Sequence, residues 1–231
     1  MPRSSPLVAR IALLEAHHGR VASLPPRAPL EWILWENVAY LQTDERRLAC
    51  YRALEAKVGL TAEDLARAPR SVLLALAKQG GMLPAERADK LRAIGALALE
   101  HGGKDLRSVL ALPLPKARKV LALFPGIGAP GAEKILMLCG ASRELALESN
   151  GLRVLTRLGY GVDDGNYART YRSVQAAIAK ELRADAAWLR GAHELLRAHG
   201  KTTCRRGEPA CDACPLAKGC AFAGAADERG G

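Results

Sequence analysis

Four cysteines near the C-terminal end carry the clearest chemical signal in this sequence. Cys204, Cys211, Cys214 and Cys220 are spaced C-x6-C-x2-C-x5-C within seventeen of the 231 residues. Thiolates that lie this close along the chain can hold one tetrahedral zinc ion or one iron–sulfur cluster. Zinc sites usually pair two short knuckles across a longer loop, and here only Cys211 and Cys214 form a knuckle. A single, unevenly spaced loop favours a [4Fe-4S] cluster, although spacing alone leaves both metals open.

The residues around these cysteines point to a known family. The run HGKTTC-RRGEPAC-DAC-PLAKGC (199–220) resembles the cluster loop of endonuclease III-type DNA glycosylases. Three upstream segments match the same family in the same order: WENVAYLQT (35–43), LFPGIGAPGAEKIL (123–136) and LESNGLRVLTRLGY (147–160). The second resembles the family's helix–hairpin–helix, with residues 124–128 as the hairpin. The matches extend over residues of about 30 to 220, and the loop and the hairpin are the specific ones.

This resemblance implies an all-α, two-lobed helix–hairpin–helix DNA glycosylase fold with a C-terminal iron–sulfur cluster loop. Residues 29–142 are expected to form a contiguous helical barrel lobe that ends in the hairpin. Residues 1–28 and 143–231 are expected to form the cluster-bearing lobe, in which the four cysteines hold a [4Fe-4S] cluster. The implied partner is double-stranded DNA that contains a lesion or mismatch, bound by a monomer.

The spacing of apolar residues independently predicts a helical chain. Apolar residues recur at intervals of three and four, without sustained strand alternation, in segments 7–14, 32–41, 48–58, 72–76, 85–99, 132–138, 152–158, 174–182 and 187–196. Thr61 followed by Asp64 is typical of a helix cap. Gly80 and Gly81 are expected to end one helix before Pro84 opens the next. The proline-rich segment 24–29 predicts a linker.

Composition restricts the class of protein and of partner. A formal charge of +10 and a pI near 9.6 fit an anionic partner, although charge alone also fits general solubility. Aromatic residues make up only 4%, which argues against a single-strand binder built on stacking platforms. The sequence has no eighteen-residue apolar run and no recognisable signal peptide, so we expect a cytoplasmic, nucleoid-associated protein without membrane contact and with reduced cysteines. Cys50 and Cys139 lie in apolar helical runs and are expected to be buried.

The resemblance also assigns a candidate catalytic carboxylate. Breaking an N-glycosidic bond develops positive charge on the sugar, which a facing carboxylate stabilises. The family places an aspartate after the hairpin, and the matching residue here is Glu148. Glutamate adds a methylene, and a misplacement of about 1 Å can cost about 100-fold in rate. A reshaped pocket that uses Glu148 is the favoured interpretation, and a weakened site is the alternative. Asn150 either contacts the flipped nucleotide or, as we favour, caps a helix.

The position after the hairpin determines the expected reaction. Bifunctional members carry a lysine there, whose amine forms a Schiff base with the sugar, whereas this chain has Pro130, which suits the first turn of a helix. The prediction is a monofunctional glycosylase that hydrolyses the N-glycosidic bond of a damaged or mispaired base. The alternatives are a bifunctional glycosylase/AP lyase with Lys134 as relocated nucleophile, and a non-catalytic damaged-DNA-binding protein. Lys134 is more simply solvated or phosphate-facing. Glu36 is the candidate second acid, with an ordinary surface carboxylate as the simpler interpretation.

The hairpin and an early Gln-Thr pair are the first expected DNA contacts. Gly126, Ile127 and Gly128 would bring backbone amides close to a phosphate at the start of the next helix. Gln42 either enters the gap left by the flipped nucleotide or belongs to a polar helix C-terminus, and we weigh these equally.

The cluster loop adds a third expected contact. Lys201, Arg205 and Arg206 form a short basic finger that could meet the phosphodiester backbone, with solvated charge as the alternative. The five histidines show no ligand spacing with each other and are expected to be surface or core residues.

Overall fold

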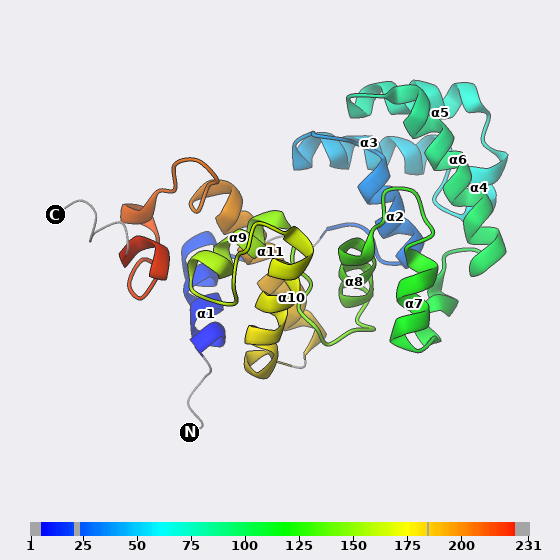
Figure 1. The fold of residues 1–231 in the computed structure, drawn as a ribbon. Helices are drawn as coiled ribbons and strands as arrows, with labels where there is room; N and C mark the ends of the chain where they lie inside the picture. Colours follow the sequence, from blue (N-terminus) through cyan, green and yellow to red (C-terminus); the bar gives the residue numbers. More distant parts are fainter. Residues whose placement is uncertain (1–5, 21–23, 184, 225–231) are drawn as a thin grey trace. The chain divides into compact units, whose positions relative to one another are not determined.

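The structure is a computed structural model that describes residues 6–20, 24–183 and 185–224. These residues form helices joined by loops, and no strand occurs among them beyond one isolated bridge between Tyr40 and Gly81. The all-α fold predicted from the sequence is therefore confirmed. The chain divides into two compact units, residues 24–142 and residues 1–23 with 143–231 (Figure 1).

The unit of residues 24–142 is built around one long helix. Its helices are α2 (Pro29–Asn37), α3 (Asp44–Lys57), α4 (Ala62–Arg67), α5 (Arg70–Ala77), α6 (Pro84–His101), α7 (Leu114–Leu121) and α8 (Ala129–Leu138), with short 3-10 turns η1 (Lys78–Gly80) and η2 (Arg107–Ala111). Helix α6 packs against α2, α4 and α5. Its Leu91 and Ile94 are buried together with Leu65 of α4 and Leu73 of α5. Burial of these apolar faces is the main source of stability for helices this short.

Local sequence explains where several of these helices begin. The Thr61 side chain accepts from the Asp64 backbone, and the Asp64 side chain accepts from the Thr61 backbone, so the predicted cap is present as a complete capping box. Thr43 caps α3 in the same manner by accepting from Arg46 N. Pro84 is the first residue of α6, where its missing N–H costs nothing.

The other unit contains α1 (Pro6–His18), α9 (Ser149–Arg157), α10 (Tyr167–Ile178) and α11 (Ala186–Thr202), with 3-10 turns η3 (Ala179–Glu181) and η4 (Cys211–Ala213). Helix α11 packs against both α1 and α9. Leu7 and Leu14 of α1 and Leu189 of α11 are fully buried. The unit therefore joins the N-terminal helix to the C-terminal half of the chain.

The observed helices differ from the predicted segments most clearly at α2, α10 and α7. Helix α2 ends at Asn37 and not at 41, because the chain turns at Leu41, which has a φ of 52° and is 75% exposed. Helix α10 covers Tyr167–Ile178 and not 174–182. Apolar spacing did not predict helix α7, because Pro113 and Pro115 interrupt the pattern, and only the resemblance to a helix–hairpin–helix implied a helix before residue 124. Pro115 lies in the first turn of α7, where proline is tolerated.

The two cysteines outside the loop have different environments. Cys50 is buried, as predicted. Cys139 is only half-buried, which corrects that prediction: it follows the last residue of α8, where the chain turns away at Gly140.

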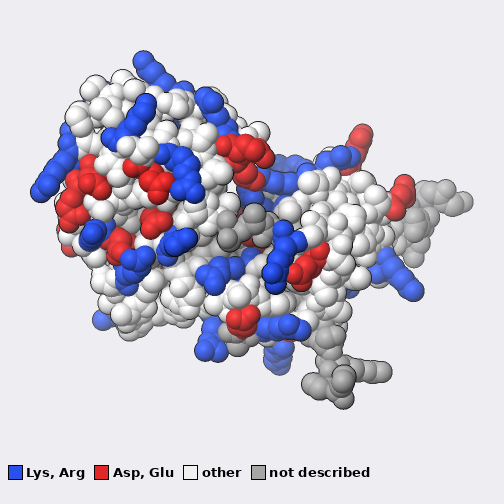
Figure 2. Space-filling view, turned by 180° about the vertical axis from the view of Figure 1, so that it is seen from behind, with Lys and Arg blue, Asp and Glu red and all other residues white. Residues whose placement is uncertain are grey.

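Basic residues are shared evenly between the two units. Each unit has 17 Lys or Arg against 12 Asp or Glu. On the face drawn in Figure 2, both signs are interspersed. The excess positive charge is therefore a property of the whole chain and does not by itself locate a binding site. Among the described residues, no helix combines the length and the apolar character that crossing a membrane requires.

Candidate functional site

In the hairpin between α7 and α8, the large side chains are buried and the backbone is accessible. Gly126 has a φ of 74°, a conformation that glycine adopts without strain. Phe124 and Ile127 are buried, so Ile127 offers no side chain to a partner. A Cβ on Gly128 would meet no heavy atom closer than 3.9 Å, which leaves the space before α8 open. The first N–H groups of a helix lack intrahelical partners, and Pro130, in the first turn of α8, removes only one of them.

Asn37 joins the hairpin to α2, a role that the sequence analysis missed. Its Nδ2 donates to the carbonyl oxygens of Ile33 and Pro125, both at 2.9 Å. A Cβ on Gly126 would lie 3.2 Å from Asn37 Oδ1. A buried amide needs such partners, and the only sequence signal was a lone asparagine at the end of an apolar helix.

Gln42 lies in a loop, which rules out the helix C-terminus considered above. Its amide lies against Gly81, where an added Cβ would come within 2.6 Å of Gln42 Nε2. Four large apolar side chains around it are exposed: Tyr40, Leu41, Met82 and Leu83. Leu41 and Leu83 have φ values of 52° and 55°. Non-glycine residues at positive φ on an exposed apolar surface often mark functional positions.

Buried Arg87 supports this loop from α6. Its guanidinium donates to the carbonyl oxygens of Ala77 and Gly81. Burial lowers the pKa of Arg87.

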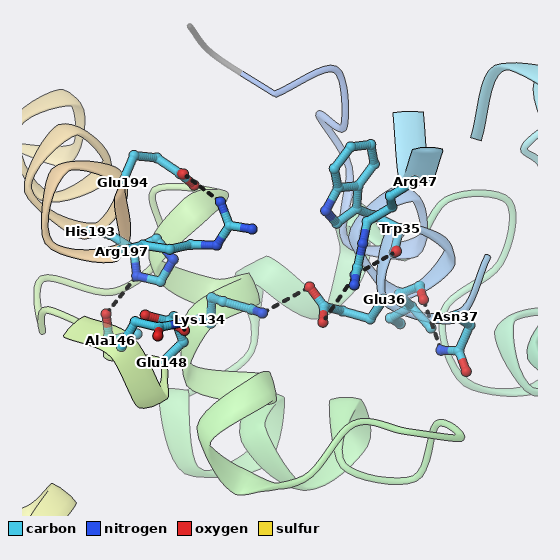
Figure 3. A network of polar contacts seen from close by, with 12 residues as sticks. Trp35, Glu36, Asn37, Arg47, Lys134, Ala146, Glu148, His193, Glu194 and Arg197 are labelled. Carbon is cyan, nitrogen blue, oxygen red and sulfur yellow. Dashed lines mark hydrogen bonds and ion pairs between the residues drawn. The ribbon is translucent and has the colours of Figure 1, made fainter. Parts of the chain in front are cut away.

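Glu36 and Lys134 form an ion pair that corrects the simpler interpretation of both residues (Figure 3). Lys134 Nζ donates to Glu36 Oε1 at 2.8 Å, and their side chains are 18% and 27% exposed. Arg47 Nη1 lies 3.8 Å from Glu36 Oε2 and donates to the Trp35 carbonyl oxygen. Glu36 is therefore held between two cations, and Lys134 is neither solvated nor free to turn toward a phosphate.

Glu148 is the N-cap of α9, a role that the sequence analysis gave to Asn150. Glu148 Oε1 accepts from Gly151 N at 2.7 Å, and Oε2 accepts from Asn150 Nδ2 at 2.8 Å. Within its own unit, the described residues provide Glu148 with no ion pair, and neutral donors orient its carboxylate at the positive end of a helix dipole. Arg153 interacts with it electrostatically without a direct contact. Asn150 instead lies in the first turn of α9.

Side chains from α10 and α11 hold the segment that leads into Glu148. The imidazole of buried His193 donates from Nδ1 to the Ala146 carbonyl oxygen at 2.8 Å (Figure 3). Tyr171 Oη accepts from Leu147 N at 3.4 Å. The Glu148 backbone is thus fixed before the helix as well as within it.

A chain of hydrogen bonds runs from Glu148 to the cysteine loop. Asn150, which donates to Glu148, accepts at Oδ1 from Arg153 Nη2 at 2.9 Å. The same guanidinium donates to the carbonyl oxygens of Gly200 at 2.7 Å and Cys204 at 3.0 Å. Gly200 also permits close packing here, because a Cβ there would lie 2.7 Å from the Asn150 Cβ and backbone oxygen.

The four loop cysteines line one pocket of the C-terminal unit. In the described part of the chain, no group of three or more His, Cys, Asp or Glu side chains has the geometry of a single-ion site. Burial and then the neighbouring cysteines Cys220 and Cys204 raise the pKa of Cys211. Arg157 donates to Cys204 Sγ at 3.4 Å and to the loop carbonyl oxygen of Arg205 at 2.7 Å. Four clustered thiols whose ionised forms repel one another suit a cationic centre, so the donor set fits the [4Fe-4S] cluster.

Two histidines, His199 and His18, form hydrogen bonds beside the cysteine loop. His199 is buried, and its Nε2 lies 3.4 Å from Cys214 Sγ while its Nδ1 lies 3.0 Å from His18 Nε2. Burial, followed by the charges of His18 and His17, lowers the pKa of His199 to about 4. A neutral His199 that donates to the sulfur through Nε2 accepts from His18 through Nδ1.

The basic finger is at the surface. Lys201, in the last turn of α11, and Arg205 and Arg206 are all exposed. Arg205 Nε donates to the Glu208 carbonyl oxygen at 3.0 Å. The structure thus brings the finger together with the cysteine loop, and it places Glu36 with Lys134 in one unit and Glu148 in the other.

Comparisons with known proteins find relatives in sequence and in structure. No family model matches the chain. An endonuclease III of Sulfolobus acidocaldarius is 26% identical over 181 residues, 78% of this chain and 76% of the relative. An endonuclease III of Rickettsia prowazekii is 32% identical over 111 residues, about half of each protein (47% and 48%).

Solved structures share the fold over nearly the whole chain. A trapped endonuclease III–DNA covalent intermediate aligns with a TM-score of 0.72 at 19% identity, over 98% of this chain and all of that one. A thermostable thymine-DNA glycosylase aligns with a TM-score of 0.73 at 17% identity, over 95% and 97% of the two chains. Its sequence relatives are endonucleases III, and it shares its fold with DNA glycosylases, so the chain is similar in sequence and in fold to the endonuclease III-like helix–hairpin–helix DNA glycosylase superfamily.

Proposed function

We propose that the protein is a monofunctional DNA glycosylase of base excision repair, which hydrolyses the N-glycosidic bond of a damaged or mispaired base in double-stranded DNA. The observation that carries this proposal is the hydrogen bonding of the Glu148 carboxylate. Its carboxylate is held at the start of α9 by the Gly151 N–H and the Asn150 amide. Neutral donors fix its direction and leave its negative charge available to a substrate.

Glu148 then acts on the sugar. As the base leaves, positive charge develops on the sugar ring, and a preoriented carboxylate lowers the energy of that state. Its two hydrogen bonds are made before substrate arrives, so no reorganisation is needed at the moment of reaction. The added methylene of glutamate is accommodated because the side chain folds back onto its own helix as the cap.

Water, and not an amine, completes the reaction in this proposal. Pro130 stands where bifunctional relatives have their lysine. Lys134, one turn further on, is an ammonium in an ion pair with Glu36, and an ammonium has no lone pair with which to attack the sugar. A relocated lyase nucleophile is therefore the less favoured alternative.

Three surfaces would hold the DNA. The open start of α8 at Gly128 offers backbone N–H groups to a phosphate. Gln42 and the exposed Leu83 beside it can fill the gap left by an extruded nucleotide, because polar groups pair the orphan base and apolar side chains wedge between base steps. The basic finger of Lys201, Arg205 and Arg206 supplies sequence-independent phosphate contacts.

The four cysteines would hold a [4Fe-4S] cluster that cross-links the C-terminal loop and does no bond chemistry. The purified protein should be brown and should absorb at about 400 nm, whereas a zinc-loaded protein would be colourless. Cys211→Ser should lose iron, and Cys139→Ser, outside the loop, should keep it. Full iron content in Cys211→Ser would remove Cys211 from the ligand set.

The activity is tested by incubating the protein with a panel of duplexes, each carrying one lesion or mismatch. Release of a base from one of them, with the strand intact until alkali is added, supports the proposal. Strand cleavage without alkali would favour the bifunctional alternative. Tight lesion-dependent binding without base release on any duplex would favour a non-catalytic damage-binding protein.

A further inference from the structure

A cleft of about 660 Å³ is lined only by residues of the unit formed by 1–23 and 143–231. Three separate stretches of chain line the cleft. They are one face of α9, the loop before α10 together with the first turn of α10, and both ends of the cysteine loop. Its volume is in the range of about 300–1,000 Å³ that is usual for small-molecule sites. The proposed glycosylase mechanism uses none of its lining side chains as a catalytic group.

The cleft is positively charged. Arg153, Arg157 and Arg206 line it, and Asp163 is the one carboxylate among its lining residues. Asp163 Oδ1 already accepts from Gly165 N and Thr170 Oγ1. The charge of the arginines therefore exceeds what the lining neutralises, and the cleft favours an anion.

The three arginines differ in mobility. Arg153 and Arg157 donate to backbone carbonyl oxygens, to Asn150 and to Cys204 Sγ, which fixes their positions. The Cys204 sulfur offsets part of their charge. Arg206 is exposed, and among the described residues its guanidinium forms no hydrogen bond or ion pair. Arg206 is thus the group that can close on a phosphate, and phosphate is a preferred partner of arginine.

Two aromatic rings line the same cleft in a chain that has few. Tyr167 is 46% exposed, and its ring centroid is 6.1 Å from that of Tyr171. One face of Phe222 is covered by the Arg157 guanidinium at 4.4 Å. Exposed aromatic faces beside arginines are the usual means of stacking an unpaired base, because every base has a flat π-face.

We propose that this cleft binds one unpaired nucleotide, with its phosphate on Arg206 and its base against Tyr167. A single stacking position agrees with the low aromatic content, which excludes only the longer platforms that track a strand. A base pair within a continuous stack presents no free face to Tyr167, so the nucleotide must be free or at an unpaired position of a strand.

The probe is deoxyadenosine monophosphate, titrated calorimetrically into the iron-loaded full-length protein, with deoxyadenosine and inorganic phosphate as half-ligands. The nucleotide should bind more tightly than either half. Tyr167→Ala and Arg206→Ala should each weaken it by about 5- to 100-fold. Tyr167→Phe keeps the ring and should retain binding.

The matched controls are Arg205→Ala, an exposed arginine next in sequence that does not line the cleft, and Tyr40→Ala, an exposed tyrosine of the other unit. Both should leave nucleotide affinity within about twofold, since neither removes a stacking or cleft contact. Equal weakening by Arg205→Ala would reduce the effect to general charge and overturn the proposal. Absence of binding at millimolar nucleotide, or phosphate alone binding as tightly as the nucleotide, would also overturn it.

A second titration separates the two sources of the nucleotide. A duplex with a one-nucleotide overhang is compared with its blunt counterpart in the parent and in Tyr167→Ala. A preference for the overhang that disappears in Tyr167→Ala assigns the cleft to a strand, and nucleotide binding without that preference assigns it to a free nucleotide. Glu148→Gln should keep nucleotide binding while it loses base release, so failure of either proposal is seen separately.

Discussion

Glu148 and Glu36 are both partly buried carboxylates at a helix terminus, and they differ in what surrounds them. Glu148 precedes α9 and accepts from a backbone N–H and a side-chain amide. Glu36 is the next-to-last residue of α2, with Lys134 at 2.8 Å and Arg47 at 3.8 Å from its oxygens. Neutral donors orient a carboxylate without neutralising its charge, whereas neighbouring cations neutralise that charge. Of the two, only Glu148 is prepared to stabilise a cationic sugar.

The largest expected effect is on Glu148. Glu148→Gln should slow single-turnover base release by at least about 100-fold, because it removes the charge that stabilises the developing cation. A glutamine oxygen can still accept from Gly151 N, and only the bond from Asn150 Nδ2 is lost, so the unfolding temperature should fall only slightly. Glu36→Gln is the matched control and should leave base release within a few-fold. If the two substitutions slow the reaction equally, the contrast between them is wrong.

A smaller loss of base release should follow from a substitution that displaces Glu148 but leaves its side chain unchanged. Gly200→Ala places a methyl 2.7 Å from Asn150 and must displace the start of α9, so we expect about a tenfold loss of base release. Gly191→Ala in the same helix meets nothing within 4 Å and should only stabilise the helix, by about 0.5–1 kcal/mol. Full activity in Gly200→Ala would show that the hydrogen bonds of Glu148 do not set its catalytic position.

Glu36 should matter for stability and not for chemistry. Glu36→Gln leaves the half-buried Lys134 ammonium without its carboxylate, and we expect a loss of about 1–2 kcal/mol in the free energy of unfolding. Adding Lys134→Met removes the orphaned charge and should restore most of that stability. Denaturation of the single and double variants measures both values. A double variant no more stable than Glu36→Gln alone would argue against the pair as the cause.

The smallest effect concerns the basic finger. Arg205→Ala with Arg206→Ala should weaken binding to lesion-bearing and undamaged duplexes about equally and reduce the salt slope by about one to two units. Arg52→Ala, an exposed arginine paired with Glu55, is the control for total charge. Loss confined to damaged duplexes, with an unchanged slope, would instead assign the finger to lesion recognition.

Local signals predicted the fold well where they were strong. The Thr61–Asp64 capping box and the proline that opens α6 were visible in the sequence, because caps depend on residues three positions apart. The end of α2 was not visible, since Leu41 continues the apolar pattern while its φ is positive and its side chain faces solvent. Periodicity records which residues are apolar and not which of them are buried.

In the candidate site, too, local motifs were predicted and long-range contacts were not. Motifs located Glu148, the hairpin and the cysteines, because each is a compact run of sequence. The Glu36–Lys134 pair and the bond from Asn37 to Pro125 join residues separated by 98 and 88 positions. Contacts at such separations are set by tertiary packing, and no spacing rule in one sequence predicts them. They are also the contacts that changed the interpretation of Lys134 from a solvated side chain to an ion-paired one.

Borohydride trapping shows whether this protein releases a base without an amine nucleophile, with a duplex whose lesion the protein excises as substrate. We expect base release by the parent, no covalent protein–DNA adduct, and strand breaks only after alkali or heat, because Pro130 cannot form a Schiff base and Lys134 is held by Glu36. An adduct in the parent that is absent from Lys134→Ala would contradict this expectation and make the enzyme a lyase with a relocated lysine.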